Sequence, residues 1–246
     1  MSLFTADLVM NTAKAAFRVA RPFTVYKEIE CLKESTATGY SFPSGHATHA
    51  GILFTSVAKY KKNRIVTVCC MIAVLLVGIS RLYLACHWPL DILVGWALGI
   101  CFALFVSDIF LKLFDRKEKT LRFFLPAGIV CISAYLIFAV AVDFFGANRK
   151  IFSDLSKNLA VLGSFLISVY FEEKYFNFEI PEHWTKRLIN FSGALLGAVF
   201  FLVVLKRILP KNTIFTAVQY ALLIAWGFGL WPAIICKTAK NKKTAT

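Results

Sequence analysis

The chain has 246 residues, of which 58% are hydrophobic and 15% aromatic, and its mean hydropathy of +0.66 is too high for an ordinary soluble domain. The net charge of +14 alone would suggest a nucleic-acid partner. However, the basic residues form short clusters between apolar runs rather than one continuous face, so the pattern argues against nucleic acid as a partner.

Apolar runs recur along the whole chain, and several reach the roughly 20 residues that a bilayer-spanning helix needs. We predict spans at about 47–58, 65–86, 89–111, 121–145, 155–171, 188–205 and 214–236. The predicted fold is therefore all-α, a polytopic integral membrane helical bundle with about seven transmembrane helices. Because no Gly/Ser-rich linker or internal repeat divides the chain, we expect residues 114–246 to add helices of unknown role to the same domain as residues 1–113.

The Lys and Arg residues between the spans fall unequally on the two sides of the membrane if each span crosses once. One side holds sixteen of them, in the loops near residues 60, 117 and 180 and at the C-terminus, whereas the loops on the other side hold six. The positive-inside rule assigns the richer side to the cytoplasm. Segment 14–46 and the junction near 80–91 are then expected on the outer face.

The seven cysteines include no CxxC pair and no His–Cys spacing that suits zinc. Four of them, Cys69, Cys70, Cys101 and Cys131, lie in the interior of apolar runs, where cysteine is commonly a small hydrophobic residue. Cys31 and Cys86 are both expected on the outer side, so a disulfide between them is a pairing that the sequence leaves open.

Three basic residues precede Pro22 at helical spacing. Lys14, Arg18 and Arg21 recur at i, i+4 and i+7, which predicts that all three project from one face of a helix that Pro22 interrupts. A cationic stripe with no acidic residue nearby requires an anion. An amphipathic helix that lies in the interface and reaches lipid phosphates is an alternative interpretation of this stripe.

Segment 39–46 reads GYSFPSGH and leads directly into the first apolar span. Ser44 can cap this helix, which leaves the N–H groups of Gly45 and His46 pointing outward from its first turn. A helix N-terminus of this kind binds phosphate readily, and His46 adds a group that exchanges a proton near neutral pH. A plain helix cap whose histidine faces lipid headgroups is the alternative.

The third segment, residues 80–91, reads SRLYLACHWPLD. Pro89 suits the first turn of a helix, so the next span is expected to begin with His87 at its mouth. His87 and Asp91 are four residues apart, which allows the carboxylate to hold one imidazole nitrogen while the other nitrogen faces a substrate. Arg81 adds a planar guanidinium that can bind two phosphate oxygens at once.

Together, KxxxxxxRP at 14–22, PSGH at 43–46 and SRxxxxxHxxxD at 80–91 resemble the three-part signature of the type-2 phosphatidic acid phosphatase superfamily. The order and the defining residues match, and the resemblance extends over about residues 14–110. It implies a membrane phosphatase that hydrolyses a lipid phosphate or an isoprenoid (di)phosphate at the outer face, with no metal or other cofactor.

The resemblance also implies a role for each matching residue. His87 attacks phosphorus and forms a phosphohistidine intermediate, while Asp91 orients and activates it. His46 acts as the general acid toward the leaving group. The remaining matching residues hold the phosphate oxygens: Lys14, Arg21, Ser44, Gly45 and Arg81. This assignment agrees with the needs of phosphoryl transfer, which depends above all on positioning and charge stabilisation.

Three further residues are interpreted without a place in the signature. His49 follows His46 by three residues and is expected to line the pocket or to pack. Arg18 lies within the first motif, which leaves an accessory phosphate contact open. His183 is expected to be a solvated histidine in a cytoplasmic loop.

Other functions remain open. A lipid phosphotransferase would pass the phosphoryl group from His87 to an acceptor other than water. A polytopic transporter would place ionisable groups near the middle of the spans, and the sequence contains none there. A haloperoxidase would share the same residues around vanadate, but such a lipid-embedded chain argues against it. The sequence specifies neither the lipid nor the oligomeric state.

Overall fold

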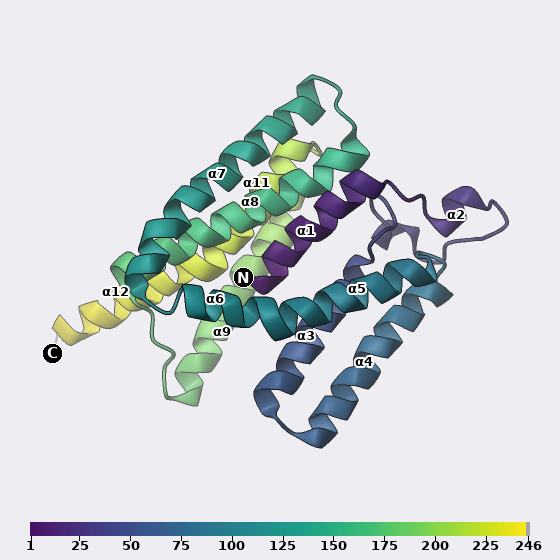
Figure 1. Cartoon of the computed structure of the whole chain (residues 1–246). Coiled ribbons are helices and arrows are strands. Elements are labelled where there is room, and N and C mark those ends of the chain that lie inside the picture. Colours follow the sequence, from purple (N-terminus) through teal and green to yellow (C-terminus); the bar gives the residue numbers. More distant parts are fainter. Residues whose placement is uncertain (245–246) are drawn as a thin grey trace. The chain divides into compact units, whose positions relative to one another are not determined.

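The computed structural model describes residues 1–244, and it describes the side chains of all of these except Ser35, Lys150 and residues 239–244. In this range every regular element is a helix, so the all-α prediction is confirmed. The chain forms two compact units (Figure 1). The first consists of Met1–Leu113 with Asn148–Leu155, and the second consists of Phe114–Ala147 with the chain from Ser156 onward.

The first unit carries the three motifs at the ends of short helices. Its elements are α1 (Ser2–Phe17), α2 (Pro22–Val25), the 3₁₀ turn η1 (Glu34–Thr36), α3 (Gly45–Lys61), α4 (Arg64–Tyr83), α5 (Pro89–Cys101), the π-helical turn η2 (Phe102–Val106) and α6 (Ser107–Leu113). Helices α4 and α5 both pack against α3, and so does α1 (Figure 1). The chain reverses direction between α3 and α4 and again between α4 and α5, which returns the motifs to one end of the unit.

A tight turn produces the first of these reversals. Lys62 adopts a left-handed conformation with φ 49°, and the Asn63 side chain accepts hydrogen bonds from the N–H groups of Ile65 and Val66. The cap satisfies two of the donors that a helix N-terminus leaves unpaired. Helix α4 can therefore begin immediately after α3 ends.

Helices α3 and α5 approach closely because glycine occupies their contact. A Cβ atom added at Gly99 would lie 2.3 Å from the carbonyl oxygen of Thr48, and one added at Gly95 would lie 2.7 Å from that of Ser44. A larger residue at either position would push the two helices apart. The Ser44 N–H also donates to the Asp91 carbonyl oxygen at 3.0 Å. These contacts hold the starts of α3 and α5 side by side.

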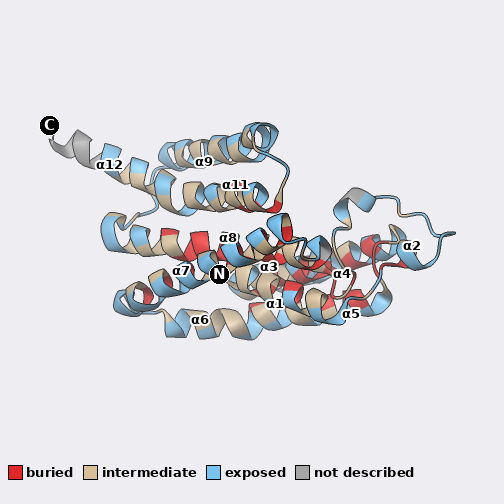
Figure 2. Ribbon diagram, turned by 90° about the horizontal axis from the view of Figure 1, so that it is seen from above, coloured by how far each residue is buried: buried red, intermediate tan, exposed pale blue. Residues whose placement is uncertain are grey.

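The second unit contains α7 (Lys117–Phe144), which at 28 residues is longer than any helix of the first unit, and three π-helical turns. Its elements are α7 (Lys117–Phe144), α8 (Arg149–Phe171, whose first residues belong to the first unit), η3 (Glu172–Phe176), α9 (Trp184–Val199), η4 (Phe200–Val204), α10 (Leu205–Ile208), α11 (Thr213–Ala225), η5 (Trp226–Leu230) and α12 (Trp231–Thr244). The Asp143 carboxylate accepts hydrogen bonds from the N–H groups of Thr213 and Ile214, and so caps α11. Helix α9, which is described in full, contains no buried residue (Figure 2).

Each of the predicted spans coincides with a helical segment, although the spans predicted at 65–86 and 121–145 extend three residues and one residue beyond the ends of α4 and α7. The number of about seven is not confirmed. Within the described part of the chain, five helical segments are long and apolar enough to cross a membrane: Arg64–Tyr83, Pro89–Leu113, Lys117–Phe144, Trp184–Ile208 and Thr213–Thr238. Helix α3, with 17 residues, and helix α8 are not among these five. Whether these two helices also cross the membrane stays a prediction.

Candidate active site

Residues from all three motifs meet at one end of the first unit. Arg21 lies between α1 and α2, and Ser44 directly precedes α3. Arg81 lies in the last turn of α4, Asp91 lies in the first turn of α5, and His87 occupies the connection between these two helices. All five residues are buried. Burying so many polar groups costs free energy unless they find partners, so their contacts decide what the site can do.

The imidazole of His87 is held by the carboxylate of Asp91. Nδ1 of His87 lies 3.3 Å from Oδ2 of Asp91, one helical turn away along the sequence. The same carboxylate oxygen accepts a hydrogen bond of 2.8 Å from the Trp88 N–H. Pro89 begins α5, so Asp91 lies in its first turn, where the helix dipole favours a carboxylate.

The contacts of His87 determine which ring nitrogen carries the proton. Nε2 lies 3.3 Å from Nη1 of Arg21, and a guanidinium can only donate hydrogen bonds. Nε2 therefore accepts, and the proton lies on Nδ1, toward Asp91. Burial lowers the pKa of His87, the hydrogen bond to Asp91 partly offsets this, and the charge of Arg21 lowers the pKa further. The ring is thus neutral at physiological pH, with the lone pair of Nε2 facing away from the carboxylate.

Ser41 completes this group, although sequence analysis did not identify it. Its hydroxyl donates a hydrogen bond to Oδ2 of Asp91 and lies 3.3 Å from Nδ1 of His87. The Ser41 N–H donates to the carbonyl oxygen of Val19 at 2.8 Å, which fixes the segment before α3 against the chain that follows α1. Ser41 and His87 are 46 residues apart, and no spacing rule connects residues so distant in sequence.

Backbone carbonyl groups, rather than carboxylates, hold the guanidinium of Arg21. It donates to the carbonyl oxygens of Thr38 at 2.6 Å, Gly39 at 3.2 Å, Tyr40 at 3.2 Å and Cys86 at 2.8 Å. Burial lowers the pKa of Arg21, but a guanidinium remains charged in proteins. These acceptors are neutral and no described carboxylate forms an ion pair with Arg21, so its positive charge next to His87 can attract a further anion.

The predicted stripe of Lys14, Arg18 and Arg21 on one helix face is wrong. Helix α1 ends directly before Arg18, which adopts a left-handed conformation with φ 51°. Arg18 is exposed, and its Nε donates back to the Ala15 carbonyl oxygen at 3.0 Å, so it does not join the site. Arg21 lies in extended chain beyond the helix, and Pro22 begins α2 instead of interrupting α1.

His46 and Arg81 lie together on another side of the site. Nη1 of Arg81 lies 3.5 Å from Nε2 of His46 and 3.3 Å from Oγ1 of Thr36. Desolvation, the charge of Arg81 and, more weakly, that of Lys14 in the last turn of α1 together lower the pKa of His46 to about 4. His46 is therefore neutral at physiological pH unless an anion offsets these charges. Its ring remains open to solvent at the mouth of the site.

Two buried polar atoms of the site have no hydrogen-bond partner within the described chain, Oγ of Ser44 and Nε of Arg81. Ser44 occupies the position before α3, but the prediction that its side chain caps this helix is wrong, since the hydroxyl accepts no hydrogen bond there. Gly45 is the first residue of α3. An unsatisfied buried donor costs about 1–3 kcal/mol and calls for an explanation. A bound anion would supply the missing acceptor to both atoms.

The chain matches two related family models. Residues 1–115 match the PAP2 superfamily, and residues 156–243 match the transmembrane extension of PAP2 superfamily phosphatases. The chain belongs to the PAP2 superfamily. The first match contains all three motifs, and the second match agrees with the apolar helices of that region. The protein is therefore an integral membrane protein.

Several curated proteins are similar to parts of this PAP2 chain. An undecaprenyl-diphosphatase of Sulfolobus acidocaldarius is 34% identical over 103 residues, which cover 40% of the chain and 47% of the relative. Phosphatidylglycerophosphatase B of Bacillus subtilis is 33% identical over 94 residues, covering 35% and 44%, and a lipid A 1-phosphatase of Rhizobium johnstonii is 31% identical over 111 residues, covering 44% of each. The chain thus spans about half the length of these relatives. No solved structure is significantly similar to it.

Two other histidines of this PAP2 protein, His49 and His183, form no hydrogen bond with the ring of His87 or with its partner Asp91 in the described chain. Nε2 of His49 lies 2.5 Å from Oδ1 of Asp7, which joins α3 to α1, so His49 serves packing between helices. His183 directly precedes α9 and is exposed, as a solvated loop histidine should be. Among the described residues, no three His, Cys, Asp or Glu side chains come together in a way that could hold a metal ion.

Proposed function

We propose that this PAP2 protein is a membrane phosphatase that hydrolyses a lipid phosphate or an isoprenoid (di)phosphate through a phosphohistidine on His87. One observation carries the proposal. A neutral histidine, backed by the carboxylate of Asp91, lies beside buried Arg21, and buried Arg81 lies beside His46 at the same site. Neither arginine forms an ion pair with any described carboxylate. Such a site attracts a multiply charged anion and presents a nucleophile to it.

Phosphate binding satisfies the groups that lack partners. Nε of Arg81 and Oγ of Ser44 donate to phosphate oxygens and gain the acceptors that the described chain does not provide. The first-turn N–H groups of α3, beginning at Gly45, add donors and the positive end of the helix dipole. Lys14 contributes charge. These cations supply the positive charge that a divalent metal would otherwise provide, and a metal among them would be repelled. The proposed reaction therefore uses no metal or other cofactor.

Binding also frees the nucleophile. Nη1 of Arg21 turns from Nε2 of His87 to a phosphate oxygen, while its other nitrogens keep their contacts to the carbonyl groups of residues 38–40. Nε2 then attacks phosphorus, and the bond from phosphorus to the leaving oxygen breaks. The Nδ1 proton stays directed at Asp91 and Ser41, which stabilise the positive charge that develops on the ring.

His46 supplies the proton that the leaving oxygen needs. Desolvation and nearby cations hold the pKa of His46 near 4. A bound phosphate dianion raises this pKa because its negative charge favours the protonated ring, so the ring takes up a proton when substrate binds. It gives this proton to the leaving lipid alcohol or, from a diphosphate, to the leaving lipid phosphate. Neutral His46 then accepts a proton from water as the water oxygen attacks phosphorus. The N–P bond breaks, and inorganic phosphate leaves.

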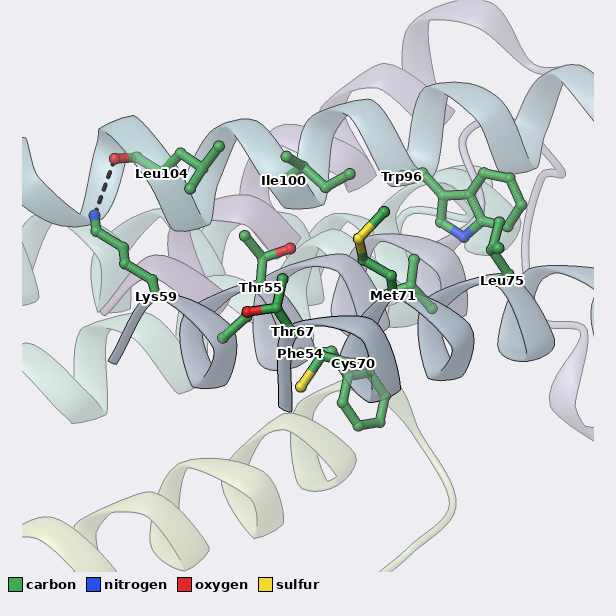
Figure 3. Close-up of a pocket in the computed structure, with 12 residues that line it drawn as sticks. Phe54, Thr55, Lys59, Thr67, Cys70, Met71, Leu75, Trp96, Ile100 and Leu104 are labelled. Carbon is green, nitrogen blue, oxygen red and sulfur yellow. Dashed lines mark hydrogen bonds between the residues drawn. The ribbon is translucent and has the colours of Figure 1, made fainter. Parts of the chain in front are cut away.

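An apolar groove supports a substrate with a hydrocarbon chain. It lies along α3, α4 and α5, has a volume of about 530 Å³, and its walls include Phe54, Met71, Leu75, Trp96 and Ile100 (Figure 3). Figure 3 shows Leu75 and Trp96 together at one end, with Lys59 at the opposite end. Leu75 and Arg81 are six residues apart on α4, roughly 9 Å along the helix. An acyl or isoprenoid chain in the groove can therefore leave its phosphate close to Arg81.

The outer face is the proposed location of this site. The unequal distribution of Lys and Arg between the two sets of loops supports it. A single cysteine introduced at Tyr60, on a background without reactive cysteines, should resist an impermeant thiol reagent added to intact cells. Labelling of that position from outside would reverse the proposed orientation.

A release assay tests the proposed activity. The purified full chain in detergent is incubated with phosphatidate, phosphatidylglycerophosphate, an isoprenoid diphosphate and a lipid A phosphate, and inorganic phosphate is measured. We expect release from at least one of them and none from a folded His87→Ala variant. Release from none, or equal release by the variant, would contradict the proposal. An added alcohol that becomes phosphorylated instead of water would identify a phosphotransferase.

A further inference from the structure

Cys31 and Cys86 are in contact although 55 residues separate them in sequence. Their Sγ atoms lie 3.4 Å apart, with Cys86 buried and Cys31 partly exposed. Every residue in 24–34 is exposed except Cys31. A hydrogen bond between two thiols is weak, so it does not by itself explain why this loop turns one side chain inward. A covalent bond between the two sulfurs would explain it.

The loop that carries Cys31 also provides groups that hold the arginines of the phosphate site. Oγ1 of Thr36 accepts a hydrogen bond of 3.3 Å from Arg81, and the carbonyl groups of residues 38–40 accept hydrogen bonds from Arg21. Cys86 directly precedes the histidine nucleophile, and its carbonyl oxygen also accepts from Arg21, at 2.8 Å. A bond from Cys31 to Cys86 would therefore anchor this loop beside the nucleophile.

We propose that Cys31 and Cys86 are a redox-active pair whose disulfide fixes the loop of residues 26–40 over the phosphate site. Their sulfur atoms need to approach from 3.4 Å to about 2.05 Å. The exposed residues on both sides of Cys31 allow that shift, since no buried side chain of the segment 24–34 has to move. The inference rests on this geometry and does not depend on the proposed phosphatase activity.

The oxidation begins at Cys31, which is the thiol that solvent can reach. Burial, reinforced by the hydrogen bond that the Cys86 thiol makes to Cys31, raises the pKa of Cys86 to about 11 and disfavours its thiolate. The Cys31 thiolate attacks an external disulfide of low molecular mass, and the mixed disulfide forms as one thiolate leaves. Cys86 loses its proton to solvent and attacks Sγ of Cys31, which expels the second thiolate. The protein loses two electrons and two protons, and the external disulfide gains them.

Thiol counting tests the pairing. The purified full chain is equilibrated with glutathione disulfide, quenched in acid, denatured and alkylated with a maleimide before mass measurement. We expect two fewer alkylated thiols than the seven in the sequence, and a tryptic digest should contain a disulfide between the peptides with Cys31 and Cys86. Cys69→Ser should still lose two thiols on oxidation, whereas Cys31→Ser should lose none. Seven free thiols in the oxidised wild type, or a disulfide between other cysteines, would overturn the pairing.

Limited trypsin digestion of the folded protein tests the effect on the loop. Lys27 and Lys33 are exposed and flank Cys31, so they report how readily the loop opens. We expect cleavage at these lysines to be several-fold slower in the oxidised wild type than in the reduced protein. The Cys31→Ser variant should be cut at the same rate with and without glutathione disulfide. Equal rates in oxidised and reduced wild type would overturn the proposed fixing of the loop.

Discussion

The site end of the first unit and the helices of the second unit bury different groups. Around His87, charged and polar side chains are buried and contact one another or the backbone. On α9 no residue is buried, and side chains such as Leu196, with 71% of its surface exposed, face outward. A lipid environment by itself accounts for exposed apolar helices, so the exposed side chains of α9 indicate that the protein lies in a membrane and do not indicate a function. Buried charge costs free energy in any environment and therefore reports function.

Replacing one histidine in each region should give the largest difference in phosphate release between two variants. His87→Ala removes the proposed attacking nitrogen, and phosphate release should fall below about one thousandth of the wild-type rate. His183→Ala changes an exposed side chain before α9 and should leave activity and stability unchanged. Asp91→Asn should lose less activity than His87→Ala, because the nucleophile remains. Phosphate release and thermal unfolding are measured on the same preparations, and a folded His87→Ala protein with normal turnover would contradict the comparison.

Two serines whose hydroxyls lack hydrogen-bond partners in the described chain sharpen the comparison between the site and the second unit. Oγ of Ser44 and Oγ of Ser156, in the second unit, are both buried and have no hydrogen-bond partner in the described chain. Orthovanadate can become five-coordinate on an imidazole nitrogen and so resembles the transition state of attack on phosphorus, and we expect it to inhibit phosphate release. Ser44→Ala should weaken this inhibition 10–100-fold, which is roughly one hydrogen bond to a charged group, while the melting temperature stays unchanged or rises. Ser156→Ala should leave vanadate inhibition unchanged. Equal effects on vanadate inhibition would mean that Ser44 does not bind the phosphate group.

Two serines that do donate hydrogen bonds separate positioning from stability. Ser41→Ala removes a hydrogen bond to Asp91, so kcat should fall about tenfold with little change in KM, because Ser41 touches the histidine and not the substrate. Ser164 is buried in the second unit and donates to the Ala221 carbonyl oxygen at 2.6 Å. Ser164→Ala should lower the free energy of unfolding by about 1 kcal/mol and leave kcat unchanged. A Ser41→Ala variant that loses only stability would make Ser41 an ordinary packing residue.

The smallest expected effect is proton uptake by His46. Its pKa is lowered from 6.5 to about 4, so between these values the folded protein binds fewer protons here than the unfolded chain, and this contribution to stability decreases as pH falls from 6.5 toward 4. A bound anion raises the pKa again, so inorganic phosphate should bind with uptake of up to about one proton per site near pH 5.5. Calorimetry in buffers with different ionisation enthalpies measures this uptake. His46→Gln should abolish this proton uptake. Identical uptake in the wild type and in His46→Gln would contradict the role of His46 as the group that takes up the proton.

Helical periodicity and local spacing made much of the fold and part of the site predictable. The apolar runs predicted the helices of both units, because a membrane helix encodes its length and polarity directly in sequence. The contact of His87 with Asp91 followed from a separation of one helical turn. Length and polarity do not decide whether α3 and α8 cross the membrane, because α3 is short and α8 is more polar than the five long apolar segments.

The rest of the site depends on tertiary structure that spacing rules do not encode. Arg21 matched helical spacing with Lys14, yet Arg18 ends α1 in a left-handed conformation, and the guanidinium of Arg21 donates hydrogen bonds to backbone carbonyl groups outside the helix. Those carbonyl groups come from residues 38–40 and Cys86, which no local pattern connects. Ser41 is a similar case, because its role appears only when the segment before α3 packs against the start of α5.

Oxygen exchange between inorganic phosphate and water tests the central claim, a phosphohistidine on His87, most directly. If His87 carries the phosphoryl group, the last step of the reaction is reversible without any lipid: inorganic phosphate phosphorylates the histidine with loss of water, and water returns with a different oxygen. The purified wild type, incubated with phosphate in ¹⁸O-labelled water and excess EDTA, should incorporate ¹⁸O into phosphate, and His87→Ala should not. A wild-type protein that hydrolyses lipid phosphate but incorporates no ¹⁸O, or that needs added magnesium to do so, would contradict the account.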